Sequence, residues 1–82
     1  MGAVAKDQAE LSALARNMRA ALESSGLSMR EAARRIGISQ AAMSYYLSAQ
    51  RCPDCLVLLR FSLLTKRSVK SLLRGIPITT SI

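Results

Sequence analysis

The stretch LSMREAARRIGISQAAMSYYL, residues 27–47, has the pattern of two short helices joined by a tight corner. Ser28 stands three residues before Glu31, which is the spacing of a capping box and predicts a helix start. Gly37 falls where a left-handed residue is needed to end that helix, since glycine adopts positive φ without a Cβ penalty. Ser39 is then in position to cap the second helix.

The second helix, predicted over residues 40–47, has a mainly polar outer face, formed by Gln40, Ala41, Ser44 and Tyr45. The remaining apolar positions of the pair form its predicted core: Ala32, Ala33, Ile36, Ile38, Met43 and Tyr46. Because the side chain of Ala33 is small, the two helices can cross closely. A short helix, a glycine corner and a second helix with an exposed polar face are typical of a helix-turn-helix that reads DNA.

The composition favours one small helical domain with a polyanionic partner. A chain of 82 residues has room for one modest core, and half of its residues are apolar with only two Tyr, one Phe and no Trp. Such a core of Leu, Ile, Ala and Met favours helices over a sheet. The net charge of +7 suits a polyanion, although a basic surface that only aids solubility is an alternative. Without a membrane-length apolar run or a signal peptide, we expect a cytoplasmic protein.

The first part of the chain predicts an arm followed by a helix. Residues 1–7 are expected to be a flexible arm, and the domain to span residues 8–75. Asp7 and Glu10 have capping-box spacing, so a helix is predicted to begin there. Its apolar stripe is Leu11, Leu14, Ala15, Met18 and Leu22. Gly26 is expected to end it.

The second part of the chain predicts two more helices and a tail. Pro53 suits the first position of a helix, and residues 55–64 are so apolar that we expect a central helix buried on most sides. Ser68 is predicted to cap a last short helix that ends at Gly75. Residues 76–82 are more strand-like than helical and are a candidate dimerisation segment.

Several short motifs occur in a characteristic order: GLS at 26–28, EAARRIGIS at 31–39, Q-x-x-M-S at 40–44, Pro53, and S-x-x-x-L-L at 68–73. Together they make the chain resemble the lambda-repressor/Cro-like (XRE-type) helix-turn-helix family. The resemblance implies a compact all-α domain of five helices that binds DNA. The chain departs from the family at Met29, where a glutamine commonly ties phosphate to the reading helix, and at Ala32, where the family has a larger apolar residue.

The predicted DNA contacts divide into two sets. Base edges are expected to meet Gln40, Ala41, Ser44 and Tyr45, with the Gln40 amide matching N7 and N6 of adenine. A solvated glutamine at a helix start is the alternative for that residue. Phosphates are expected to meet Ser28 and Ser39, where helix N-termini attract anions, and the flanking Arg30 and Arg51. These phosphate contacts would supply most of the affinity and its salt dependence.

The two cysteines, Cys52 and Cys55, form a C-x-x-C that could hold half a zinc site or a redox pair. The chain has no His and no further Cys, so we expect no metal site and no cofactor. The resemblance places Cys55 at a buried aliphatic position, which favours a structural role over a redox switch. No catalytic set of residues emerges, so an enzyme is not expected.

One short helix reads too few base pairs alone, so we expect a homodimer on double-stranded DNA. Its candidate interface residues are Val69, Leu72, Leu73, Ile76 and Ile78. The sequence therefore predicts a transcriptional regulator of the phage repressor or Cro type on an inverted-repeat operator. A toxin–antitoxin autoregulator, a redox-sensing regulator and a module that binds a protein partner through its apolar tail are the alternatives.

Overall fold

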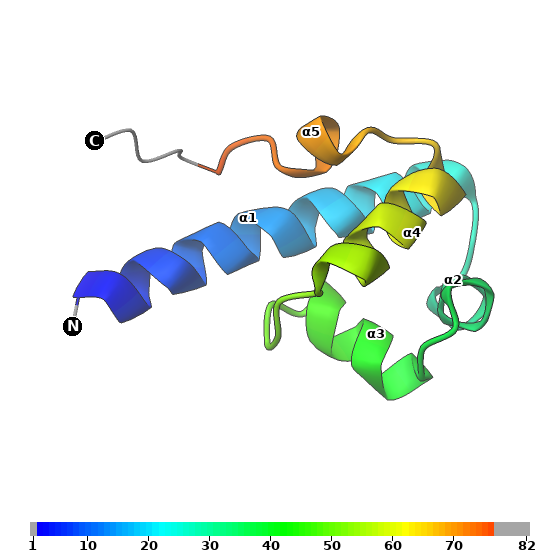
Figure 1. Ribbon diagram of the computed structural model, residues 1–82, viewed down its shortest axis with the longest axis horizontal. Coiled ribbons are helices and arrows are strands. Elements are labelled where there is room, and N and C mark those ends of the chain that lie inside the picture. Colours follow the sequence, from blue (N-terminus) through cyan, green and yellow to red (C-terminus); the bar gives the residue numbers. More distant parts are fainter. Residues whose placement is uncertain (1, 77–82) are drawn as a thin grey trace.

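The computed structural model describes residues 2–76, with side chains from residue 8 onward, and this part of the chain forms five helices (Figure 1). They are α1 (Gly2–Ser25), α2 (Met29–Ile36), α3 (Gln40–Leu47), α4 (Cys55–Thr65) and α5 (Val69–Leu72). The prediction of an all-α, five-helix domain is confirmed. Residues 77–82 of the predicted strand-like tail, Ile78 among them, lie outside the described residues.

Helix α1 is longer than the sequence pattern predicted, because it begins at Gly2 and not near Asp7. Residues 2–7 are therefore its first turns and do not form a separate arm. Ala3, Ala5 and Lys6 are strong helix formers and no proline interrupts them, which lets the helix extend beyond the domain core. In Figure 1 the other helices gather over the second half of α1.

The core lies between α1 and the remaining helices. It consists of Leu14, Met18, Ala21, Leu22, Ala32, Ala33, Ile36, Met43, Leu47, Val57, Phe61 and Leu72. The predicted apolar positions of the helix pair all contribute, since Ile38 and Tyr46 pack against this cluster as partly buried side chains. Ala32 and Ala33 are almost fully buried where α2 meets its neighbours, so small side chains suit the close packing there.

Helix α4 differs from its prediction. Only Val57, Phe61 and Thr65 are buried, all on the side that packs against α1, α2 and α5. Leu56, Leu59 and Leu63 are exposed to 55%, 45% and 80% on the other side. The expectation of a helix buried on most sides was wrong, because no described element covers this second face. The helix begins at Cys55 and not at Pro53, because Asp54 caps it and accepts a hydrogen bond from the Val57 N–H at 2.8 Å.

Helix α5 is held on α1 by side-chain and apolar contacts. The Asn17 amide donates to the carbonyls of Leu72 and Arg74, at 2.8 and 2.7 Å. Leu72 is 1% exposed and fills the core, so it has to be removed from the predicted dimer surface. Of the other residues in that set, Val69 and Ile76 are half-buried and Leu73 is exposed.

Candidate nucleic-acid interface

Local hydrogen bonds fix the corner between α2 and α3. The hydroxyl of Ser28 accepts from the Glu31 N–H, and that of Ser39 accepts from the Ala42 N–H, each at 3.0 Å. Gly37 has a φ of 88°, and its N–H donates to the Ala33 carbonyl at 2.9 Å. The caps and the left-handed glycine occur at the residues the sequence indicated. Together they fix the direction in which α3 leaves α2.

Two arginines from other helices cap the C-terminal ends of α2 and α3, and no local sequence pattern predicts these contacts. Arg60 of α4 donates to the carbonyl of Ile36, the last residue of α2, at 3.3 Å. Arg19 of α1 donates to the carbonyl of Leu47, the last residue of α3. Cations at these ends also interact favourably with the helix dipoles. The two contacts therefore tie the motif to the rest of the domain.

Helix α3 presents all four predicted base-contacting residues to solvent. Gln40, Ala41, Ser44 and Tyr45 are exposed, whereas Met43 and Leu47 on the opposite side are buried. In Figure 1, α3 forms the lower edge of the domain, and its first turn lies farthest from α1 and α5. The outer face of α3 is therefore open to a large partner along its whole length.

The predicted phosphate-contacting residues are exposed as well: Ser28, Arg30, Ser39 and Arg51. Arg51 lies in the loop after α3, and its guanidinium stacks 4.8 Å from the centroid of the Tyr45 ring. The Gln50 and Arg51 N–H groups both donate to the Tyr45 carbonyl, at 2.9 and 3.3 Å, so the loop folds back on the end of α3. Tyr45 thus positions a cation beside the polar face.

Arg34 and Arg35, on α2, have a different environment from Arg51. Both pair with the Glu31 carboxylate, with 2.8 Å between Arg35 Nε and Glu31 Oε2. Hydrogen bonds from Arg34 and then Arg35 hold the pKa of Glu31 below its ordinary value. Glu31 thereby offsets part of the positive charge of α2, whereas Arg51 stacks on a neutral ring.

The cysteines do not form part of a metal site or a core. Cys52 and Cys55 are both free and exposed, so the buried structural position expected for Cys55 was wrong. Cys55 is the first residue of α4, at the exposed start of that helix. Among the residues that the structure describes, no three His, Cys, Asp or Glu side chains are grouped to hold a metal ion.

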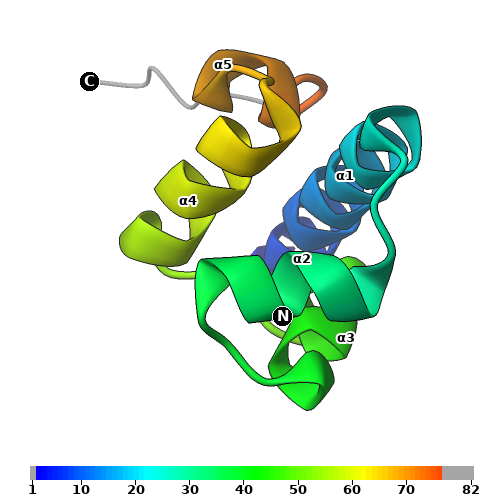
Figure 2. The ribbon, with the colours of Figure 1, turned by 90° about the vertical axis from the view of Figure 1, so that its right-hand side faces the viewer.

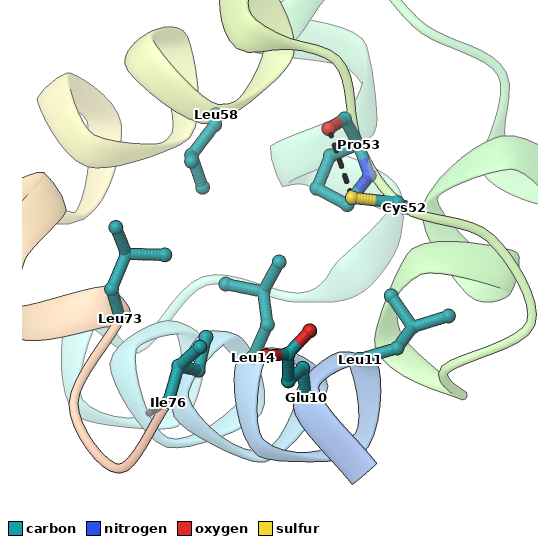
Figure 3. A pocket seen from close by; sticks show the side chains of 8 residues that line it. All are labelled: Glu10, Leu11, Leu14, Cys52, Pro53, Leu58, Leu73 and Ile76. Carbon is teal, nitrogen blue, oxygen red and sulfur yellow. Dashed lines mark hydrogen bonds between the residues drawn. The ribbon is translucent and has the colours of Figure 1, made fainter. Parts of the chain in front are cut away.

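An apolar hollow of about 470 Å³ lies between α1, the start of α4 and the chain after α5 (Figure 3). It is lined by Glu10, Leu11, Leu14, Cys52, Pro53, Leu58, Leu73 and Ile76. Glu10 supplies the single charged group of this lining. None of the predicted DNA-contacting residues lies in it, so the hollow and the α3 face are separate surfaces.

A family model described as helix-turn-helix matches residues 18–70, about two thirds of the chain. The chain belongs to the XRE-type, lambda-repressor/Cro-like helix-turn-helix family. It is accordingly a DNA-binding transcription regulator of the XRE type. No curated protein and no solved structure matches the chain.

One feature distinguishes this XRE-type domain at the start of α2. Met29, which occupies the position of the family's common glutamine, is half-buried and packs against the core. It contributes packing to the core at a position where the family commonly has a polar side chain. In the described part of the domain, no helix is both long and apolar enough to cross a bilayer.

Proposed function

We propose that this XRE-type protein is a sequence-specific regulator of the phage repressor or Cro type that binds an inverted-repeat operator as a dimer. The observation that supports it best is the outward face of α3, where an amide, a methyl group and two hydroxyl groups lie together on an exposed helix. Such a helix fits the major groove of B-DNA, where amide and hydroxyl groups can hydrogen bond to base edges.

Gln40 is the residue proposed to contribute most to base discrimination. It is the first residue of α3 and is exposed, so its side-chain amide can reach a partner. A bidentate pair with adenine would give roughly 1–3 kcal/mol of discrimination against other bases. Ala41, Ser44 and Tyr45 would add a methyl contact and hydroxyl contacts along the same groove.

Affinity would come mainly from cations and helix N-termini around α3. Arg30 and Arg51 are exposed, and the caps Ser28 and Ser39 mark the two helix starts at which phosphates would bind. The +7 charge of the chain adds a long-range attraction to DNA. Each phosphate contact releases counterions, so binding should weaken steeply as salt is raised.

Selection of bound fragments from a random pool of duplex DNA tests this proposal. The expected result is a consensus of two half-sites in inverted order, about one helical turn apart from centre to centre. Binding to every fragment alike, with no enriched sequence, would contradict it. A consensus with a single half-site would support base reading by α3 but contradict binding as a dimer.

A further inference from the structure

Three leucines form an exposed apolar stripe along α4. Leu56, Leu59 and Leu63 follow one another at steps of three and four residues, so their side chains lie on one side of the helix. This side is opposite the buried Val57 and Phe61. Exposed apolar surface of this kind, gathered on one helix face, is typical of an interaction site and not of a solvated surface.

We propose that this leucine stripe (Leu56, Leu59 and Leu63) is the surface through which two copies of the chain associate. The inference rests on the dimer in the proposed function and identifies its interface. It moves that interface from α5 and the tail, where Leu72 is buried in the core, to α4. Because a two-fold interface uses the same patch on both copies, a stripe of leucines can be self-complementary.

The charge distribution favours a second copy as the occupant. Arg60 is the single charged residue within α4, and its guanidinium is directed to the carbonyl of Ile36 on α2. The stripe is therefore uncharged on a chain of charge +7, which is where two like-charged copies can approach with the least repulsion. It offers no cation to DNA or to an acidic protein, so neither of these fits it well.

The two ends of α4 carry opposite charges. Asp54 caps the start and is exposed, and Lys66 and Arg67 follow the end and are exposed. A two-fold axis across the helix near Leu59 places the second α4 antiparallel to the first. Asp54 of each copy then approaches Lys66 and Arg67 of the other, and the two helix dipoles oppose each other favourably. The leucines meet in the middle of this arrangement.

The position of α4 also suits two copies on one DNA duplex. Figure 2 shows α4 on one flank of the domain and α3 at its lower end. The stripe faces away from α1 and α2, since these helices pack against the other side of α4. Consider a two-fold axis that runs beside this flank and parallel to the direction in which the outer face of α3 points. This axis places the α3 helices of both copies on the same face of the dimer. An inverted repeat requires this arrangement.

Sedimentation of the full chain, in reductant so that the exposed cysteines stay unlinked, tests the inference. The double variant Leu59→Gln/Leu63→Gln removes apolar surface without changing charge or disturbing the core. We expect it to raise the dimer dissociation constant by roughly 100-fold or more, since four leucines lose burial across the interface. The matched control is Leu73→Gln, which removes an exposed leucine on the α5 side and should leave the dimer unchanged.

Two results would overturn the inference: a wild-type chain that is monomeric at 100 µM, or a double variant that still dimerises like wild type while Leu73→Gln does not. Circular dichroism should give equal helix content for all three proteins, and loss of helix in the double variant would show that the stripe belongs to the fold itself. Binding to a single half-site separates this inference from the proposed function. A monomeric double variant that retains base preference supports both the α4 interface and base reading by α3. A wild-type dimer without any base preference contradicts only base reading by α3.

Discussion

Helices α3 and α4 are both free of acidic residues, and each buries one side in the same core, but their outer faces differ in kind. The outer face of α3 carries Gln40, Ser44 and Tyr45, whose polar atoms have specific directions. The outer face of α4 carries leucines, which offer apolar surface but no directional hydrogen-bonding groups. A polar face suits a partner with a pattern of donors and acceptors, and an apolar one suits a partner that excludes water. One fold thus presents two surfaces of different chemistry, each suited to a different kind of partner.

The largest expected effect separates the two sides of α4. Phe61→Ala removes a side chain with no exposed surface and should cost about 3–5 kcal/mol of unfolding free energy. Leu63→Ala, two residues away on the exposed side, should change it by less than about 0.5 kcal/mol in the monomer. Urea unfolding at the lowest practicable protein concentration measures both. If both variants lost the same unfolding free energy at every protein concentration, the leucine stripe would be packed within its own chain.

The comparison also explains which parts of the fold the sequence could predict. The start of α2, the corner at Gly37 and the start of α3 depend on side chains within four residues, so local spacing is enough to find them. The apolar face of α4 is ambiguous by nature. A helix that is apolar all round has the same pattern whether its own chain or a second chain covers it, and only the packing of the other helices decides.

The contacts between residues far apart in the chain could not be predicted from any local sequence pattern. Arg19 and Arg60 look like ordinary surface cations in the sequence, yet each caps a helix 28 or 24 residues away. The stacking of Arg51 on Tyr45 depends on the loop turning back, in which Ala49 takes a positive φ of 63°. Alanine is not a residue that marks such a turn. The exposure of the predicted site residues could be inferred from the helix pattern, but the contacts that position them could not.

A smaller effect is expected on the polar face of α3. Gln40→Ala should remove about 1–3 kcal/mol of discrimination at one base position per half-site and leave other positions unchanged. The matched control is Gln50→Ala, which removes the same side chain from the exposed loop beyond α3. Competition binding with singly substituted operators measures both. If Gln40→Ala instead weakened binding to every sequence alike, Gln40 would contact the DNA backbone and would not read a base.

Arg51 is expected to act on affinity without affecting base preference. Arg51→Ala should weaken binding to all sequences alike and lower the slope of log affinity against log salt by about one. Tyr45→Phe keeps the ring under the guanidinium and should preserve that slope. Arg74→Ala removes the same charge near α5, at the opposite end of the domain from α3, and is the control (Figure 1). An identical loss of slope in Arg74→Ala would show a general charge effect with no specific phosphate contact.

The smallest expected effect lies on α2, the helix against which both α3 and α4 pack. The pairs with Arg34 and Arg35 lower the pKa of Glu31, so folding favours its charged form. This contribution to stability is present above the ordinary carboxyl pKa and is lost as pH falls through the lowered one. Glu31→Gln should therefore be slightly less stable than wild type near neutral pH and equal to it in acid. Thermal unfolding across pH measures this, with Glu23→Gln as the control for losing one exposed carboxylate. A difference that persisted unchanged into acid would mean that packing of the side chain, and not its charge, stabilises the start of α2.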